Sequence, residues 1–198
     1  MLVKRFTIFF FFLLISFLLV NKSNSIEPSI FVQSTVNRAS EALDDKNSKE
    51  DKIKLLMNIA SETVDIRGIG FYTLGSYRKE MTESQKTLYT DLFKKYFLKS
   101  FSSRLAEYSN PEIEVKTEKK LNDNYTIVNS VLVATDKRPE VKIDWRIYTK
   151  IPNQPLIRDL IIEGLSLART QKEEFSSIIQ SNDGDINALF ISLKKFIN

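Results

Sequence analysis

The sequence predicts an α+β fold, in which a four-stranded antiparallel sheet packs against a helical layer with an apolar ligand cavity between them. Two observations carry this prediction. Apolar residues recur at helical spacing in the first and last thirds of the chain, whereas they alternate with polar residues over much of 113–162. The alternating segments also follow one another through short connections, which is typical of an antiparallel meander. Helices, then strands, then helices indicate helices gathered on one side of a sheet.

The first two helices are expected in residues 28–64. Residues 28–45 carry one apolar stripe, and Pro28 suits the first turn of a helix. A polar break follows, and Ser48 is placed to cap a second helix. Both stripes are expected to serve core packing.

The next segment, residues 65–79, holds three of the five glycines and predicts short helical turns with close contacts. Thr82 and Gln85 then form a capping box. It opens the longest periodic segment, which runs to about Tyr108 and presents a wide aromatic face. This face fits either a closed core or the wall of an apolar cavity, because the two use the same residues.

Four strands are expected at 113–117, 125–134, 141–148 and 156–162. The third is the clearest, because apolar residues alternate there with Lys142, Asp144, Arg146 and Tyr148. Helical spacing returns after Gly164, and Gly184 separates two final helices.

Residues 1–25 have the three parts of a secretory signal peptide. Lys4 and Arg5 precede an apolar run from Phe6 to Val20, and Ser23 and Ser25 are small residues suited to cleavage after position 25. The run is shorter than the ~20 residues of a spanning helix. We therefore expect residues 26–198 to form a single exported domain, located in the periplasm.

Composition removes several classes of function. The chain has no Cys and no His, which excludes disulfides, thiol nucleophiles, Ser-His-Asp catalysis and His-ligated metals. Of 29 basic residues, three leave with the leader, so 26 remain against 25 acidic ones. This near-neutral balance argues against nucleic-acid binding. No metal site or cofactor is expected.

Carboxylates are the only plausible acid–base groups. Asp159 and Glu163 lie at the end of the fourth strand, about 13 Å apart if extended, which is wide for a glycosidase pair. We expect structural roles instead. Asp159 would pair with a basic neighbour such as Arg146, Glu163 would lie near a helix N-terminus, and Ser166 would cap that helix.

Three stretches together resemble one known family. They are residues 74–78 (LGSYR) followed by 81–85 (MTESQ) and Phe93, then residues 143–146 (IDWR), and finally residues 159–167 (DLIIEGLSL) with Gln171 and Phe175 downstream. The chain resembles the periplasmic lipid carriers of the Mla (maintenance of lipid asymmetry) pathway, also called the toluene-tolerance auxiliary family. The resemblance spans about residues 30–196.

The resemblance implies a monomeric, non-enzymatic phospholipid shuttle. It would carry a glycerophospholipid between an outer-membrane lipoprotein complex and an inner-membrane ABC transporter complex, and so maintain outer-membrane lipid asymmetry. Two alternatives stay open: a carboxylate-dependent periplasmic hydrolase and a periplasmic chaperone or adaptor. The side chains expected to line the lipid site are Phe71, Leu74, Phe93, Phe97, Phe101, Leu105, Val141, Ile143, Trp145 and Ile147.

Overall fold

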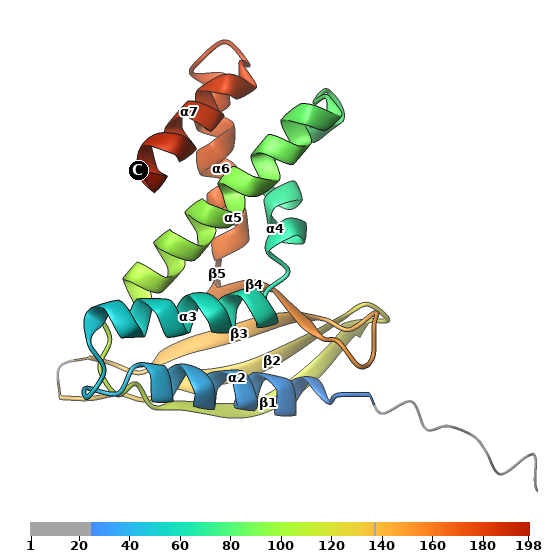
Figure 1. The fold of residues 1–198 in the computed structure, drawn as a ribbon. Coiled ribbons are helices and arrows are strands. Elements are labelled where there is room, and N and C mark those ends of the chain that lie inside the picture. Colours follow the sequence, from blue (N-terminus) through green and yellow to red (C-terminus); the bar gives the residue numbers. More distant parts are fainter. Residues whose placement is uncertain (1–24, 137) are drawn as a thin grey trace, which may run out of the picture.

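The computed structural model describes residues 25–136 and 138–198, so nearly all of the predicted signal peptide lies outside the described part. Helices come first, then a run of strands, then two more helices, as the sequence predicted (Figure 1). In chain order the elements are α2 (Pro28–Ala42), α3 (Lys49–Thr63), α4 (Ile66–Thr73), the 3-10 turn η1 (Tyr77–Lys79), α5 (Glu83–Leu105), β1 (Ile113–Asn122), β2 (Tyr125–Leu132), β3 (Val141–Tyr148), β4 (Leu156–Ile162), β5 (Leu165–Ser166), α6 (Leu167–Gln180) and α7 (Ile186–Ile197). Within these described residues, no helix is both long and apolar enough to cross a membrane.

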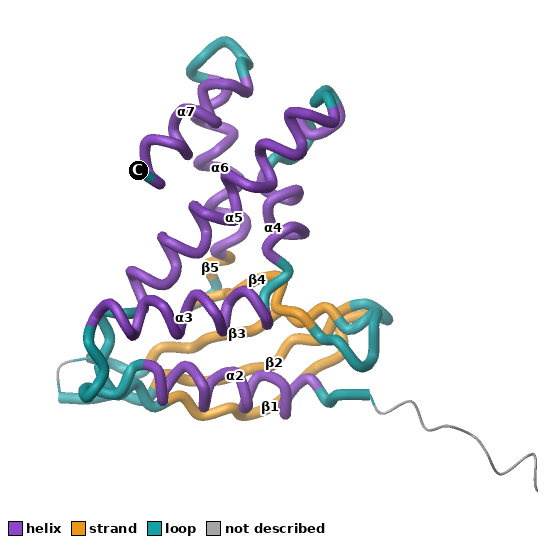
Figure 2. The backbone as a smooth tube through the Cα atoms, in the orientation of Figure 1, coloured by secondary structure: helices purple, strands orange, loops and turns teal. Residues whose placement is uncertain are grey.

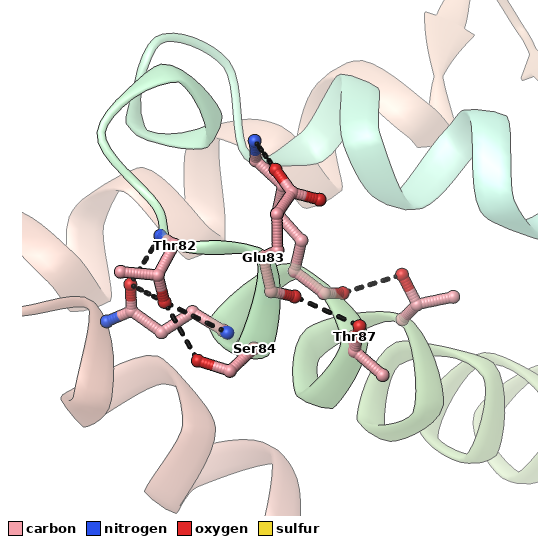
Figure 3. A network of polar contacts seen from close by, with 7 residues as sticks. Thr82, Glu83, Ser84 and Thr87 are labelled. Carbon is pink, nitrogen blue, oxygen red and sulfur yellow. Dashed lines mark hydrogen bonds and ion pairs between the residues drawn. The ribbon is translucent and has the colours of Figure 1, made fainter.

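Capping side chains set where the helices begin. Ser48 accepts a hydrogen bond from the backbone N–H of Asp51 at the start of α3. The capping box at α5 is complete, because Thr82 and Gln85 each accept a bond from the other's backbone N–H (Figure 3). One turn later, the Thr87 hydroxyl donates to the carbonyl of Glu83. Each cap satisfies a backbone donor that a helix leaves unpaired at its N-terminus.

The sheet is an antiparallel meander with the strand order β1-β2-β3-β4-β5. The sequence predicted four strands, and the fifth is a two-residue strand that pairs Ile161 with Ser166 and Ile162 with Leu165. A two-residue strand is too short to show an alternating pattern, so periodicity could not reveal it. β1 is longer than expected, because it extends to Asn122 through residues that are all exposed.

The helices cover one face of the sheet (Figure 1). Their closest approaches to it lie towards its two sides, since α2 packs on β1 and β2, while α4 and α6 pack on β4. The long helix α5 packs mainly on α3, α4 and α7, and it rises away from the sheet together with α6 and α7 (Figure 2). Side chains of β3 and of several helices belong to one apolar cluster.

Two clusters of buried side chains form the interior. The larger joins the inner face of the sheet to all six helices of the described chain. The smaller lies where the end of α2 and the middle of α3 meet the end of α5. Close packing within the larger cluster depends on Gly70, because a Cβ there would lie 2.8 Å from Cδ1 of Phe93. This glycine lets α4 approach α5, which agrees with the close contacts expected for this segment.

Candidate functional site

The structure brings nine of the ten predicted lining residues into one apolar cluster. Five are buried members of the larger cluster: Leu74, Phe93, Ile143, Trp145 and Ile147. Four are partly buried and pack against it: Phe71, Phe97, Phe101 and Val141. The tenth, Leu105, packs instead in the smaller cluster, with residues from the end of α2 and the middle of α3. The last turn of α5 has a different neighbour from the turns before it, so one helical stripe serves two clusters.

Aromatic rings follow one another along α5. The ring centroids of Phe93 and Phe97 are 6.1 Å apart, and those of Phe97 and Phe101 are 5.5 Å apart with nearly parallel planes. Phe93 also meets Phe175 of α6 edge-on at 6.1 Å. Phe93 is enclosed on all sides, whereas Phe97 and Phe101 keep part of their surface accessible. The stripe therefore passes from a fully buried ring to two rings that remain partly accessible.

The floor of this cluster is the inner face of β3. Ile143, Trp145 and Ile147 are buried, and the residues between them are more exposed, so the strand has one apolar face as the sequence predicted. The indole N–H of Trp145 donates to the Ser130 hydroxyl at 2.8 Å, and that hydroxyl donates to the carbonyl of Ile143 at 3.1 Å. Both polar groups are thus satisfied, which a buried indole and hydroxyl require.

Two surface hollows of the described chain are lined by other residues. One, of about 450 Å³, is lined by apolar and charged residues of α3, α5 and α7, among them Met57, Leu98 and Lys94. The other, of about 420 Å³, lies beside α4 and α6 and is mostly polar. None of the ten predicted lining residues lines either hollow. They pack against one another or against neighbouring core residues instead.

The carboxylate of Asp159 is part of the framework. It is only 3% exposed. One oxygen accepts the backbone N–H of Ala168 at 3.0 Å, and the other accepts the Ser166 hydroxyl at 2.6 Å. The guanidinium of Arg146 lies 3.6 Å from it, as the sequence predicted. Asp159 therefore links the start of α6 to β4. The predicted N-cap of α6 is also present, because the Ser166 hydroxyl accepts a hydrogen bond from the backbone N–H of Arg169.

Glu163 was expected to have a structural role near the N-terminus of α6. Its carboxylate makes a structural hydrogen bond to the sheet, because it accepts the backbone N–H of Lys142 on β3 at 2.5 Å. Glu163 and Gly164 have φ values of 49° and 82°, so the chain reverses there in a tight two-residue turn. This turn places the Glu163 carboxylate against the backbone of β3. The Glu163 side chain is exposed, whereas Asp159 is buried.

No group of three or more acidic side chains in the described residues is arranged to hold a metal ion. Burial raises the pKa of the Tyr89 phenol, whose hydroxyl pairs with Thr73 and the carbonyl of Gly70. The phenol of Tyr89 therefore has structural partners, as the carboxylate of Asp159 and the indole of Trp145 do. The main feature of the interior is the continuous, aromatic-rich apolar cluster between the sheet and the helices.

Fold and interior together define the class of protein: an α+β domain in which a one-faced meander and an aromatic helix enclose a large apolar cluster. The family model described as "MlaC protein" matches residues 33–195, and the chain belongs to the MlaC family. This confirms the resemblance seen in the sequence.

The chain is also similar to a solved structure, that of the phospholipid-binding protein from Ralstonia solanacearum in complex with a phospholipid. The TM-score is 0.73 and the sequence identity is 20%, and the match covers 87% of this chain and 97% of that one. At this identity the similarity establishes the fold, which confirms the α+β prediction.

Proposed function

We propose that this chain is a periplasmic phospholipid carrier. It holds a glycerophospholipid by its acyl chains in the apolar region between β3 and α5. It passes that lipid between an outer-membrane lipoprotein complex and an inner-membrane ABC transporter complex. Export through a cleaved signal peptide at residues 1–25 and action as a monomer belong to the same proposal.

One observation carries the proposal. Nine side chains chosen from sequence as lipid-lining converge on one apolar cluster, in a chain that belongs to the MlaC family. The fold is shared with a protein whose structure holds a phospholipid, which supports the same ligand class here.

The free energy of acyl-chain burial is sufficient for tight lipid binding, and a carrier needs no catalytic group. Each methylene moved from water into an apolar site gains about 0.8 kcal/mol, so a 16-carbon chain gains about 13 kcal/mol before costs. Immobilising the lipid and ordering side chains subtract a substantial part of this gain. The remainder is ample for stable loading. Because the acyl chains supply the affinity, we expect weak discrimination among headgroups that stay in water.

The arrangement of Asp159 and Glu163 supports a carrier over a hydrolase. Asp159 already accepts hydrogen bonds at both oxygens, and Glu163 is bound to the backbone of β3. A general acid or base must be within hydrogen-bond reach of its substrate. Freeing Asp159 for that task would release the start of α6.

Mass spectrometry of protein purified from the periplasm tests the proposal. We expect phospholipid to be released from the denatured protein at about one molecule per chain. A matched preparation should turn over neither reporter esters nor glycosides. Lipid-free protein with a hydrolytic activity that Asp159→Asn removes would contradict the proposal and favour the hydrolase.

A further inference from the structure

A row of apolar side chains crosses the inner face of the sheet and reaches its open edge. Ile143 of β3 pairs with Ile162 of β4, and Ile162 pairs with Leu165 of β5. Directly paired residues project from the same face of a sheet, so these three side chains are neighbours on the face that carries Trp145. The register is continuous here, since the irregularity between β3 and β4 lies further along, after Arg146.

Exposure rises steadily along this row. Ile143 is 9% exposed, Ile162 is partly buried, and Leu165 is 59% exposed. β5 is the last strand of the sheet. Helices contact both edges of the sheet, α2 at β1 and α6 at β5, yet the Leu165 side chain stays largely exposed at the β5 edge. The apolar floor therefore continues to the protein surface at β5.

Hydrogen bonds on both sides hold Leu165 in this exposed position. On one side, the backbone N–H of Glu163 donates to the carbonyl of Lys142, and the Glu163 carboxylate accepts the N–H of the same residue. On the other side, the hydroxyl of Ser166 is bound to Asp159. Because Glu163 is bound to β3 and Ser166 to β4, a small shift of the β4–β5 hairpin does not bury Leu165. A large apolar side chain fixed in water has a cost that a contact with an apolar molecule would remove.

We propose that the β4–β5 edge is the portal through which lipid acyl chains enter and leave the apolar interior, with Leu165 as its outermost contact and Ile162 as the next. This inference rests on the proposed carrier function. A chain sliding along the row keeps contact with an apolar surface from the interior to the exterior, so it is never fully hydrated during passage. Leu165 would then change the rate of transfer, whereas the amount of lipid bound at equilibrium would depend on the interior.

The test is a transfer assay with full-length mature protein. Protein loaded with fluorescent phosphatidylglycerol is mixed with phosphatidylcholine–phosphatidylglycerol vesicles that carry a quencher, and loading is followed in the reverse direction. We expect Leu165→Glu to slow loading and release about tenfold each and to leave the equilibrium occupancy within twofold of wild type. Leu165→Phe should keep the wild-type rates. Leu121→Glu is the matched control, because Leu121 is 48% exposed on β1 and should leave both rates unchanged.

A second measurement does not depend on the charged variant. The chain has no cysteine, so Leu165→Cys and Leu121→Cys can each carry a single fluorophore. Phosphatidylglycerol brominated on its acyl chains should quench the label at position 165 during transfer and should leave the label at 121 unquenched. Equal quenching at both positions, or wild-type rates in folded Leu165→Glu, would overturn the portal. If wild-type protein bound no phospholipid at all, the carrier function itself would fail, and the two failures are thereby distinguished.

Discussion

Substituting Phe97 on α5 tests whether the aromatic face of this helix contacts lipid or only packs in a closed core. Its ring stacks with Phe101 and tilts against Phe93, yet part of its surface remains accessible. Phe93, one turn earlier, is 2% exposed. Truncating a fully buried Phe to Ala costs about 3–5 kcal/mol of unfolding free energy. We therefore expect Phe93→Ala to fall in that range and Phe97→Ala to cost only about half as much.

Although Phe97→Ala should cost less stability than Phe93→Ala, it should weaken lipid binding more. A ring that contacts an acyl chain contributes roughly 1–2 kcal/mol to binding, which corresponds to about a 5- to 30-fold change in affinity. Urea denaturation measures stability, and titration with a fluorescent phospholipid measures affinity. Phe97→Ala should lose affinity in protein that remains folded at 25 °C. The reasoning is refuted if Phe97→Ala loses as much stability as Phe93→Ala and the folded fraction binds lipid as tightly as wild type.

Three named contacts and the signal-peptide pattern each give one further prediction. Ser166→Ala should lower the unfolding free energy by about 1–2 kcal/mol by removing the cap of α6, with lipid occupancy unchanged; an unaltered urea midpoint would contradict this role. Asp159→Asn should cost about 1–3 kcal/mol, because charge-assisted bonds to α6 are weakened, and a stable variant would show that this anchor is dispensable. Gly70→Ala should destabilise the protein by about 1–3 kcal/mol through overpacking against Phe93, whereas a stabilised variant would mean that α4 can shift freely. Intact-mass analysis of periplasmic protein should give a chain that starts at Ile26, and a chain that retains Met1 would rule out cleavage.

Elements with strong local signals could be predicted from the sequence. The capping residues Ser48, Thr82 and Ser166 mark helix starts that the structure confirms. The alternation in β3 identified its buried face, because one face of a half-buried strand must be apolar. The ion pair between Asp159 and Arg146 was also predicted, since neighbouring strands of a meander bring such residues together.

Features that depend on register or on distant packing could not be predicted. The hydrogen bond between Trp145 and Ser130 follows from the pairing of β2 with β3, which no local pattern specifies. Leu105 continues the stripe of α5 in sequence, but α5 leaves one cluster and enters another before it ends. Glu163 adopts a left-handed backbone conformation in the turn between β4 and β5, and its carboxylate binds the backbone of β3. In each case the deciding neighbour lies on a different element.

Quenching of Trp145 tests the central claim most directly. It is the only Trp in the chain, it is 8% exposed, and it lies in the floor of the proposed acyl-chain site. Phosphatidylglycerol brominated on its acyl chains should quench this fluorescence in loaded protein, and the unbrominated lipid should not. If the brominated lipid binds and Trp145 emission is unchanged, the acyl chains do not lie between β3 and α5, and the account of the site is wrong.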